Sequence, residues 1–205
     1  MTELRKDRIK LSVVTVAYNV PRELPRTLMS LPPNCQRHID EGDYEVIVVD
    51  NGSDPPLEAI MVNDFGKNFR LVRIDSAPPS PAHAVNRGLA EACGDVICVM
   101  IDGARLASPG LVHFGLHGAV LYNRAVVATL GWYLGSDYQQ FAIRAGYNQR
   151  AEDELLASIN WPRWLPSLRD SHNGRIFRRG LVLSNRRVER PLYAAPALDS
   201  VEWYG

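Results

Sequence analysis

The sequence predicts an α/β fold with a mostly parallel central sheet and helices on both of its faces. Apolar, β-branched runs alternate along the chain with segments of helical pattern. One of these runs, residues 96–101, shows no polar alternation, which is typical of a strand buried on both faces. Polar clusters directly follow three of the runs, as they do at the ligand-binding edge of such sheets.

Short apolar runs bounded by turn residues are predicted to be strands. They are residues 11–17, 44–49, 69–74, 96–101 and 125–130.

Helices are predicted between these strands. Asn19 is expected to cap the first one, which ends by Pro32, and Ser108 with Pro109 is expected to start another that reaches about residue 122. Gly94 fits a C-cap. The remaining helices are predicted just after Pro56 and over residues 82–92, 138–145 and 151–159.

Composition narrows the class of protein. The 205 residues carry no net charge, which offers no argument for binding nucleic acid or an anionic membrane. There is no apolar run of transmembrane length, and the charged first ten residues do not resemble a secretory signal. Three cysteines outside any motif fit a reducing compartment. We therefore expect a cytoplasmic protein, in solution or bound peripherally at the inner membrane.

The polar clusters are Tyr18-Asn19, Asp50-Asn51-Gly52-Ser53 and the segment 102–105. Parallel strands end at the same edge, so we expect all three to lie together; the alternative is that they are ordinary turns. Neither a Gly-x-Gly-x-x-Gly fingerprint nor a lysine phosphate loop is present. Asp50 could instead accept a hydrogen bond from a ribose hydroxyl or a base N–H.

Taken together, the segments VVTVAYN (13–19), VVDNGS (48–53), NRGLA (86–90), GD (94–95) and ID (101–102) resemble glycosyltransferase family 2. Their order and spacing agree over residues 11–130. The resemblance implies the GT-A fold, a Rossmann-like three-layer sandwich. It also implies a nucleotide-diphosphate sugar donor, a saccharide or lipid-linked hydroxyl acceptor, inversion at the anomeric carbon, and Mg²⁺ or Mn²⁺ held by an Asp-x-Asp motif.

By the same resemblance, Asn86 lies near the donor and Asp102 is the first acid of the metal motif. The expected nucleotide-site residues are Ala17, Tyr18, Asn19, Asp50, Asn51 and Ser53. The sequence departs from the family pattern at three positions, where Val16 replaces a proline, Val85 an arginine and Ala104 the second acid.

Ala104 makes a metal doubtful, although Asp102 with phosphates and water could hold Mg²⁺ weakly. Arg105 suggests another solution, because a guanidinium is permanently charged and binds phosphate bidentately. We hypothesise that Arg105 replaces part of the metal's charge; the alternative is that it points to solvent.

Other candidates are weaker. His113 and His117 share a helix face, but no glutamate follows His113, which argues against zinc. His83 is more consistent with an ordinary residue at a helix start. Trp132 and Tyr133 could stack on a sugar or base, although aromatic residues beside a sheet usually belong to the core.

The last part of the chain differs from the rest. Residues 1–162 form the predicted nucleotide-sugar-binding domain, whereas residues 163–205 carry eight Arg, no Lys and little apolar periodicity. This tail lacks the carboxylate base that the family uses to deprotonate its acceptor. With permitted codons, a coding sequence read one base later from Trp164 would resemble the family again. A frameshifted or truncated acceptor region is therefore one hypothesis, and a genuine divergent tail is the other.

The leading prediction is a glycosyltransferase whose activity this chain could lack. The alternative is a non-catalytic module that binds nucleotide sugars or carbohydrates. A nucleotidyltransferase is a third hypothesis, but it needs a glycine-rich loop near residues 15–25, and none is present.

Overall fold

The computed structural model describes residues 9–100, 105–121, 125–133, 139–158 and 199–202. The strands in these residues are β1 (Leu11–Ala17), β2 (Tyr44–Asp50), β3 (Phe69–Arg73), β4 (Val96–Met100), β5 (Leu106–Ala107), β6 (Leu130–Tyr133) and β7 (Asp199–Glu202). The helices are α1 (Leu24–Met29), α2 (Ala59–Asn63), α3 (Pro81–Glu91), α4 (Leu111–Val120), α5 (Gln139–Arg144) and α6 (Gln149–Ser158), with a 3₁₀ turn at Glu41–Asp43.

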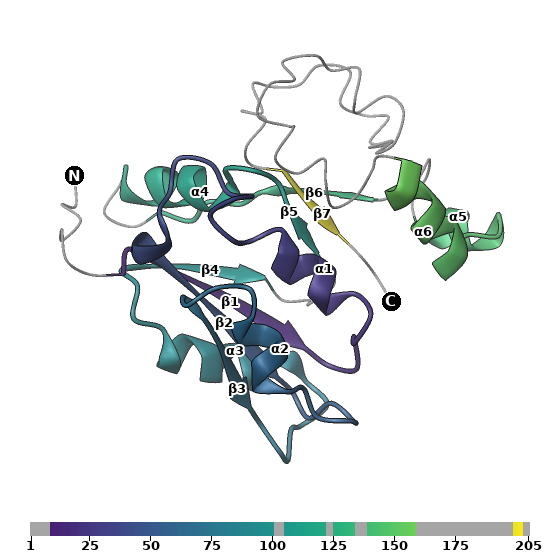
Figure 1. The fold of residues 1–205 in the computed structure, drawn as a ribbon, viewed down its shortest axis with the longest axis horizontal. Helices are drawn as coiled ribbons and strands as arrows, with labels where there is room; N and C mark the ends of the chain where they lie inside the picture. The colour runs from purple at the N-terminus through teal and green to yellow at the C-terminus, as the bar shows by residue number, and fades with distance from the viewer. Residues whose placement is uncertain (1–8, 101–104, 122–124, 134–138, 159–198, 203–205) are drawn as a thin grey trace.

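Four strands form a parallel sheet in the order β3-β2-β1-β4 (Figure 1). Ala17 pairs with Asp50, and Asp50 pairs with Arg73, so the carboxyl ends of β1, β2 and β3 finish side by side. A second sheet has the order β5-β7-β6, with β7 antiparallel to β5 and parallel to β6. The predicted parallel sheet, and with it the α/β fold class, is confirmed.

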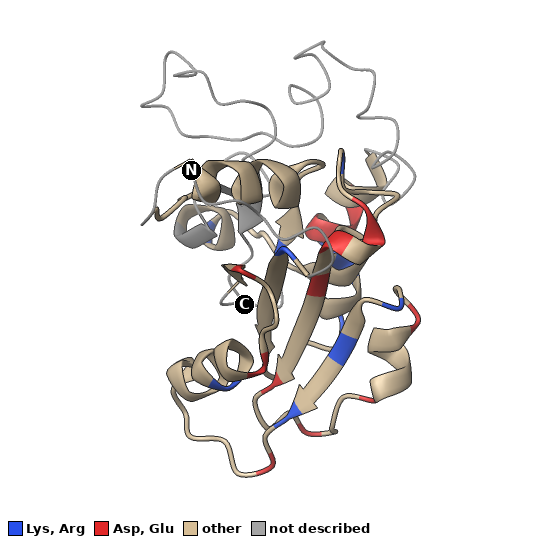
Figure 2. Ribbon diagram, turned by 90° about the vertical axis from the view of Figure 1, so that its left-hand side faces the viewer, with Lys and Arg blue, Asp and Glu red and all other residues tan. Residues whose placement is uncertain are grey.

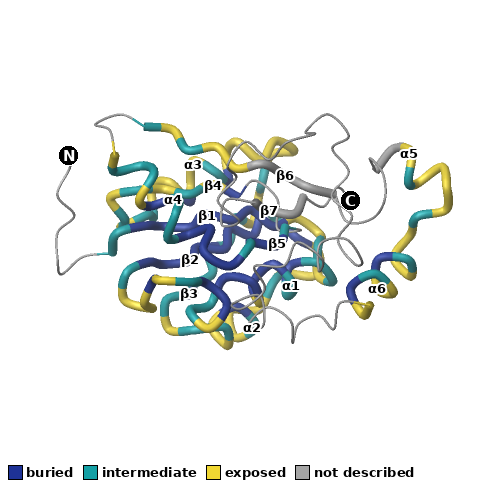
Figure 3. Tube along the Cα trace, turned by 90° about the horizontal axis from the view of Figure 1, so that it is seen from above, coloured by how far each residue is buried: buried dark blue, intermediate teal, exposed yellow. Residues whose placement is uncertain are grey.

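Side chains of β1 and β2 alternate between two apolar layers. Val13 and Val46 face the layer that α1, α2 and α4 supply, with Leu28, Val62 and Leu116 among its members. Val14, Ile47 and Val49 face the layer that α3 covers. Both central strands are buried along their whole length (Figure 3). This explains why their sequences are mostly apolar without strict alternation, since each face of these strands meets a helix.

The same reasoning was wrong for β4. Ile97 and Val99 remain 40% and 41% exposed. They pair with Ser12 and Val14 and therefore point to the α3 side of the sheet, but α3 packs against β1 and β2. An apolar run alone could not show that α3 would miss this strand.

Two predicted helix starts were also wrong. Asn19 takes a left-handed conformation, with φ of 52°, and α1 begins only at Leu24. The helix α4 begins after Gly110, with φ of 101°, rather than at Pro109. Its first amides are capped from a distant part of the chain, as described below.

Two further predictions changed. Residues 125–129 are not in a strand; β6 begins at Leu130 instead. The helix α3 ends before Ala92, and Gly94 has another role: a Cβ there would lie 2.5 Å from the Ser12 amide nitrogen. Close passage of β1 therefore requires glycine at this position.

Of the tail, residues 199–202 form β7, while the expectations for residues 163–198 and for Asp102 lie outside the described residues. None of the described helices is long and apolar enough to cross a bilayer.

Candidate functional site

Hydrogen bonds join the loops that follow β1 and β2. The Asn19 amide donates to Ser53 Oγ (3.0 Å), and Asn19 Oδ1 accepts from the Asp54 amide (2.9 Å). The Asn51 amide donates to the Ala17 carbonyl (2.8 Å). Charged positions lie at the tips of neighbouring strand arrows in Figure 2. Two of the three predicted clusters therefore meet; the third, around Asp102, lies outside the described residues.

Asp50 holds the loop after β2 in shape. Its side chain is fully buried, Oδ1 accepts from the Ser53 amide (2.9 Å), and Oδ2 accepts from the Leu57 amide (3.1 Å) and from Arg73. Burial opposes ionisation, but the hydrogen bonds from Ser53, Leu57 and Arg73 outweigh it and lower the pKa of Asp50 below its usual value. The geometry therefore suits a carboxylate that organises the edge of the sheet.

Arg73 is a residue of this edge that the sequence reasoning missed. Its guanidinium pairs with Asp50, bonds Asp75 Oδ1 (2.8 Å) and contacts the Ser53 carbonyl at 3.4 Å. The hydrogen bonds to Asp75 and Asp50 raise the pKa of Arg73 further. The available signal was its place at the end of the third predicted strand, in register with Asp50. It brings a permanent positive charge to the candidate site.

The other predicted residues differ in accessibility. Tyr18 is 59% exposed at the end of β1, and Asn86 is exposed on α3. Asn51 is buried, and within the described residues its Oδ1 has no hydrogen-bond partner. A buried acceptor of this kind is costly unless something donates to it. Tyr18 and Asn86 are thus accessible to a ligand, and the Oδ1 atom of Asn51 could accept a further hydrogen bond.

The chain beyond β4 is anchored to α1. The Arg105 amide donates to Thr27 Oγ1 (2.9 Å), and the Ala107 amide donates to Ser30 Oγ (2.9 Å). Thr27 and Ser30 lie one turn apart, so their hydroxyls reach successive points of the same passing segment. This anchoring places the backbone of Arg105 against α1.

Gln36 fixes the next part of this segment. Its Oε1 accepts from the Gly110 and Val112 amides (both 3.2 Å), which caps α4. Its Nε2 donates to the carbonyls of Ser30 (2.8 Å) and Ser108 (3.2 Å). One buried side chain therefore satisfies four backbone groups and ties together α1, the 105–110 segment and the start of α4.

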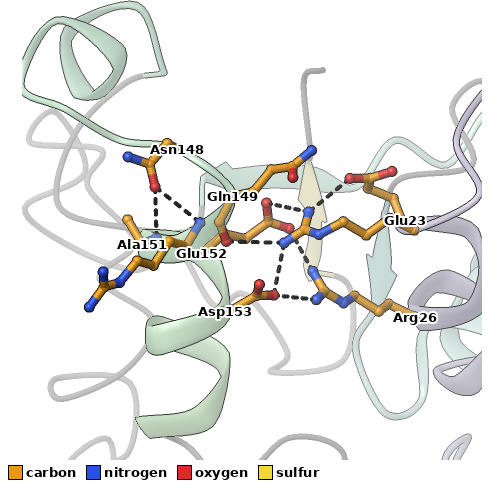
Figure 4. A network of polar contacts seen from close by, with 9 residues as sticks. Glu23, Arg26, Asn148, Gln149, Ala151, Glu152 and Asp153 are labelled. Atoms are coloured by element: carbon orange, nitrogen blue, oxygen red, sulfur yellow. Dashed lines mark hydrogen bonds and ion pairs between the residues drawn. The ribbon is translucent and has the colours of Figure 1, made fainter.

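A second polar cluster joins α6 to the beginning of α1 (Figure 4). Arg22 and Arg26 each bond one oxygen of Glu152 (2.9 Å), and both also bond Oδ1 of Asp153 (2.8 and 2.5 Å). Burial raises the pKa of Glu152 in spite of the two guanidiniums. The pKa of Asp153 is lowered, and the hydrogen bond from Arg26 is the largest cause. Sequence reasoning missed Glu152 and Asp153. The feature that could have indicated them is the acidic run 152–154 at the start of a predicted helix.

The described residues contain no group of three His, Cys, Asp or Glu side chains arranged to hold a metal ion. Any metal site would therefore have to draw on Asp102, on the substrate or on residues beyond the described ranges.

Comparison with known proteins locates the similarity in the sheet. Residues 12–102 match the family described as glycosyl transferase family 2. No curated protein sequence matches the chain.

Solved structures resemble a larger part of the chain. TarS from S. aureus superposes with a TM-score of 0.53 at 18% identity, over 64% of this chain and 23% of TarS. TarS 1–349 with UDP gives 0.54 at 18% identity, over 63% of this chain and 37% of that one. TarS 1–349 with UDP-GlcNAc gives a TM-score of 0.53 at 17% identity, over 63% of this chain and 36% of that one. The chain thus spans well under half of these structures, and the likeness shows that it has their GT-A fold.

Proposed function

We propose that the carboxyl edge of the β3-β2-β1-β4 sheet binds a nucleotide-diphosphate sugar, since residues 12–102 match glycosyl transferase family 2. The protein then transfers the sugar to a hydroxyl group of a saccharide or lipid-linked acceptor. The observation that carries this proposal is the joining of the β1 and β2 loops through Asn19 and Ser53. This edge is where open α/β sheets bind their ligands.

Within this site, Tyr18 offers an exposed aromatic ring, and Asn51 offers a buried acceptor to which no other described residue donates. Ala17 and Ser53 hold the backbone beside them through the hydrogen bonds described above. We assign the nucleotide to these residues and the sugar side of the donor to Asn86. Asp50 acts behind them as a positioning residue, because the loop amides and Arg73 already occupy both of its oxygens.

The diphosphate needs positive charge in the transition state. Family 2 enzymes supply it with a metal on an Asp-x-Asp motif, but Ala104 stands in place of the second acid, and the described residues add no ligand cluster. This donor set fits a protein-held metal poorly. We assign part of the charge to Arg105, whose backbone the Thr27 hydroxyl anchors.

An inverting transfer also needs a base for the acceptor hydroxyl. Among the described carboxylates, we assign this role to Asp153. It is half exposed, lies against the loop after β1, and receives both guanidiniums on Oδ1 alone. The bonds from Arg26 and Arg22 lower its pKa, so it is an ionised but weak base, and its second oxygen Oδ2 is the atom that would accept the proton. Glu152 is less suited, since Arg22 and Arg26 engage both of its oxygens.

Ala104 also favours a second candidate function, a module that binds nucleotide sugars without turning them over. Titration with UDP and UDP-GlcNAc, with and without Mn²⁺, combined with an assay for released UDP, separates the two. UDP is the first probe because the TarS structures contain UDP or UDP-GlcNAc. Turnover supports the transferase, whereas binding without turnover supports the module.

Arg105→Ala should weaken UDP binding, while Arg150→Ala, on the exposed side of α6, should leave it unchanged. Equal binding by both variants would remove Arg105 from the site. Failure of UDP, GDP, ADP and CDP to bind the unaltered protein would refute the proposed function as a whole.

A further inference from the structure

Three of the five histidines of the chain lie against one another, and none of them is among the residues of the candidate site. The ring centroids of His113 and His117 are 4.2 Å apart, and those of His38 and His113 are 5.3 Å apart. His113 and His117 share a face of α4, while His38 comes from the 30–40 segment that leaves α1. The cluster therefore bridges this segment and the helix.

The cluster lies beside the Gln36 cap. His38 follows Gln36 by two residues, and Gln36 Oε1 accepts from the Gly110 and Val112 amides at the start of α4. A change in the contact between His38 and α4 thus acts on a segment that also carries the cap of that helix.

The side-chain charges that act on His113 within the described part of the chain have the same sign. Among the described residues, the titratable side chains that act on it are His117, from its own helix, and His38, from the facing segment. The Phe114 ring lies edge-on at 5.0 Å. Burial, followed by the charges of His117 and His38, lowers the pKa of His113, and a hydrogen bond with the His38 backbone offsets part of this effect.

We propose that His38, His113 and His117 form a pH-sensitive contact that holds the 30–40 segment on α4 while the imidazoles are neutral and loosens when they are protonated. Rings at 4.2 and 5.3 Å can pack when uncharged. Two or three positive charges at such distances repel one another, as like charges one helical turn apart do.

The direction of the pH effect follows from linkage. The unfolded chain binds a proton at His113 more readily than the folded protein does, so the contribution of this contact is complete above about pH 6.5. It declines as the pH falls below that value. Histidine is the side chain whose ordinary pKa places such a change in the physiological range.

The test compares the full chain with His38→Gln, His117→Gln and the double variant; His83→Gln, an exposed histidine on α3, is the matched control. The urea midpoint is measured at about pH 7.5 and about pH 5.5. We expect the midpoint of the unaltered protein and of His83→Gln to fall with acidification. The fall should be smaller in each single variant and smallest in the double variant.

Hydrogen exchange of the Gly110 and Val112 amides supplies the local readout. Comparing each variant with the unaltered protein at the same pH cancels the intrinsic pH dependence of exchange. At the lower pH these amides should lose protection in the unaltered protein relative to the double variant, while the amides of β2 stay protected in both. Equal pH dependence in the unaltered protein and the double variant would overturn the proposal, as would an equal loss of pH dependence in His83→Gln.

Discussion

The buried carboxylate of Asp50 and the guanidinium of Arg73 form an ion pair between register partners at the ends of β2 and β3. The same carboxylate accepts from two amides of its own loop. The shape of the candidate site at this edge thus depends on a charge that remains paired.

Asp50→Asn should lower the urea midpoint at neutral pH, because a neutral amide cannot accept from the Ser53 amide, the Leu57 amide and Arg73 in the same way. The lowered pKa of Asp50 means that its contribution is complete above its unfolded pKa of about 3.9 and is lost as the pH falls toward its folded value. The difference between the variant and the unaltered protein should therefore shrink in acid. Urea titrations at neutral and acidic pH measure it.

Asp75→Asn is the matched control, since Asp75 also bonds Arg73 but its side chain is 88% exposed. We expect a small effect there, as for most exposed ion pairs. If both variants lowered the urea midpoint equally, burial of Asp50 would not be the reason for its contribution to stability.

Gln36→Met should destabilise the protein by about 2 kcal/mol, because it leaves the Gly110 and Val112 amides without their cap and removes the donor to Ser30 and Ser108. Gln149→Met makes the same chemical change on an exposed helix position and should be nearly neutral. Chemical denaturation of both variants checks the difference, and the interpretation fails if Gln149→Met costs as much.

Two glycine-to-alanine substitutions should have opposite effects on the stability of the protein. A Cβ at Gly88 would lie 2.2 Å from Val14 Cγ1, so Gly88→Ala should push α3 away from the sheet and cost about 1–3 kcal/mol. No described atom lies within 4 Å of a Cβ at Gly115 in α4, so Gly115→Ala should stabilise by up to about 1 kcal/mol. Thermal melts of the two variants measure both effects; a stabilised Gly88→Ala would contradict the close packing of α3 on β1.

Glu152→Gln should release α6 from α1, because it removes the buried charge that both Arg22 and Arg26 neutralise. The amides of residues 149–158 should exchange roughly tenfold faster while those of β1 and β2 keep their protection. Glu154→Gln, whose partner Arg150 lies on the same exposed helix face, is the control. Unchanged exchange in Glu152→Gln would show that other contacts hold α6.

Much of the fold could be predicted from local pattern. Short runs rich in apolar residues predicted β1 to β4 within a residue or two, and the helices between them implied parallel pairing. The convergence of Asn19 and Ser53 followed from that topology. Helix starts were predicted less well, because Gln36 caps α4 from 76 residues away, at a distance where sequence spacing carries no signal.

What the sequence by itself determined is the parallel sheet and the edge where its polar clusters meet, since periodicity and chain direction are local properties. The tertiary structure decided which charges face one another there. Asp50 and Arg73 are 23 residues apart, and Arg22 and Glu152 are 130 apart. It also decided that α3 covers β1 and β2 and leaves Ile97 exposed. Contacts of this kind depend on how helices pack across the sheet, and a short window of sequence does not encode that packing.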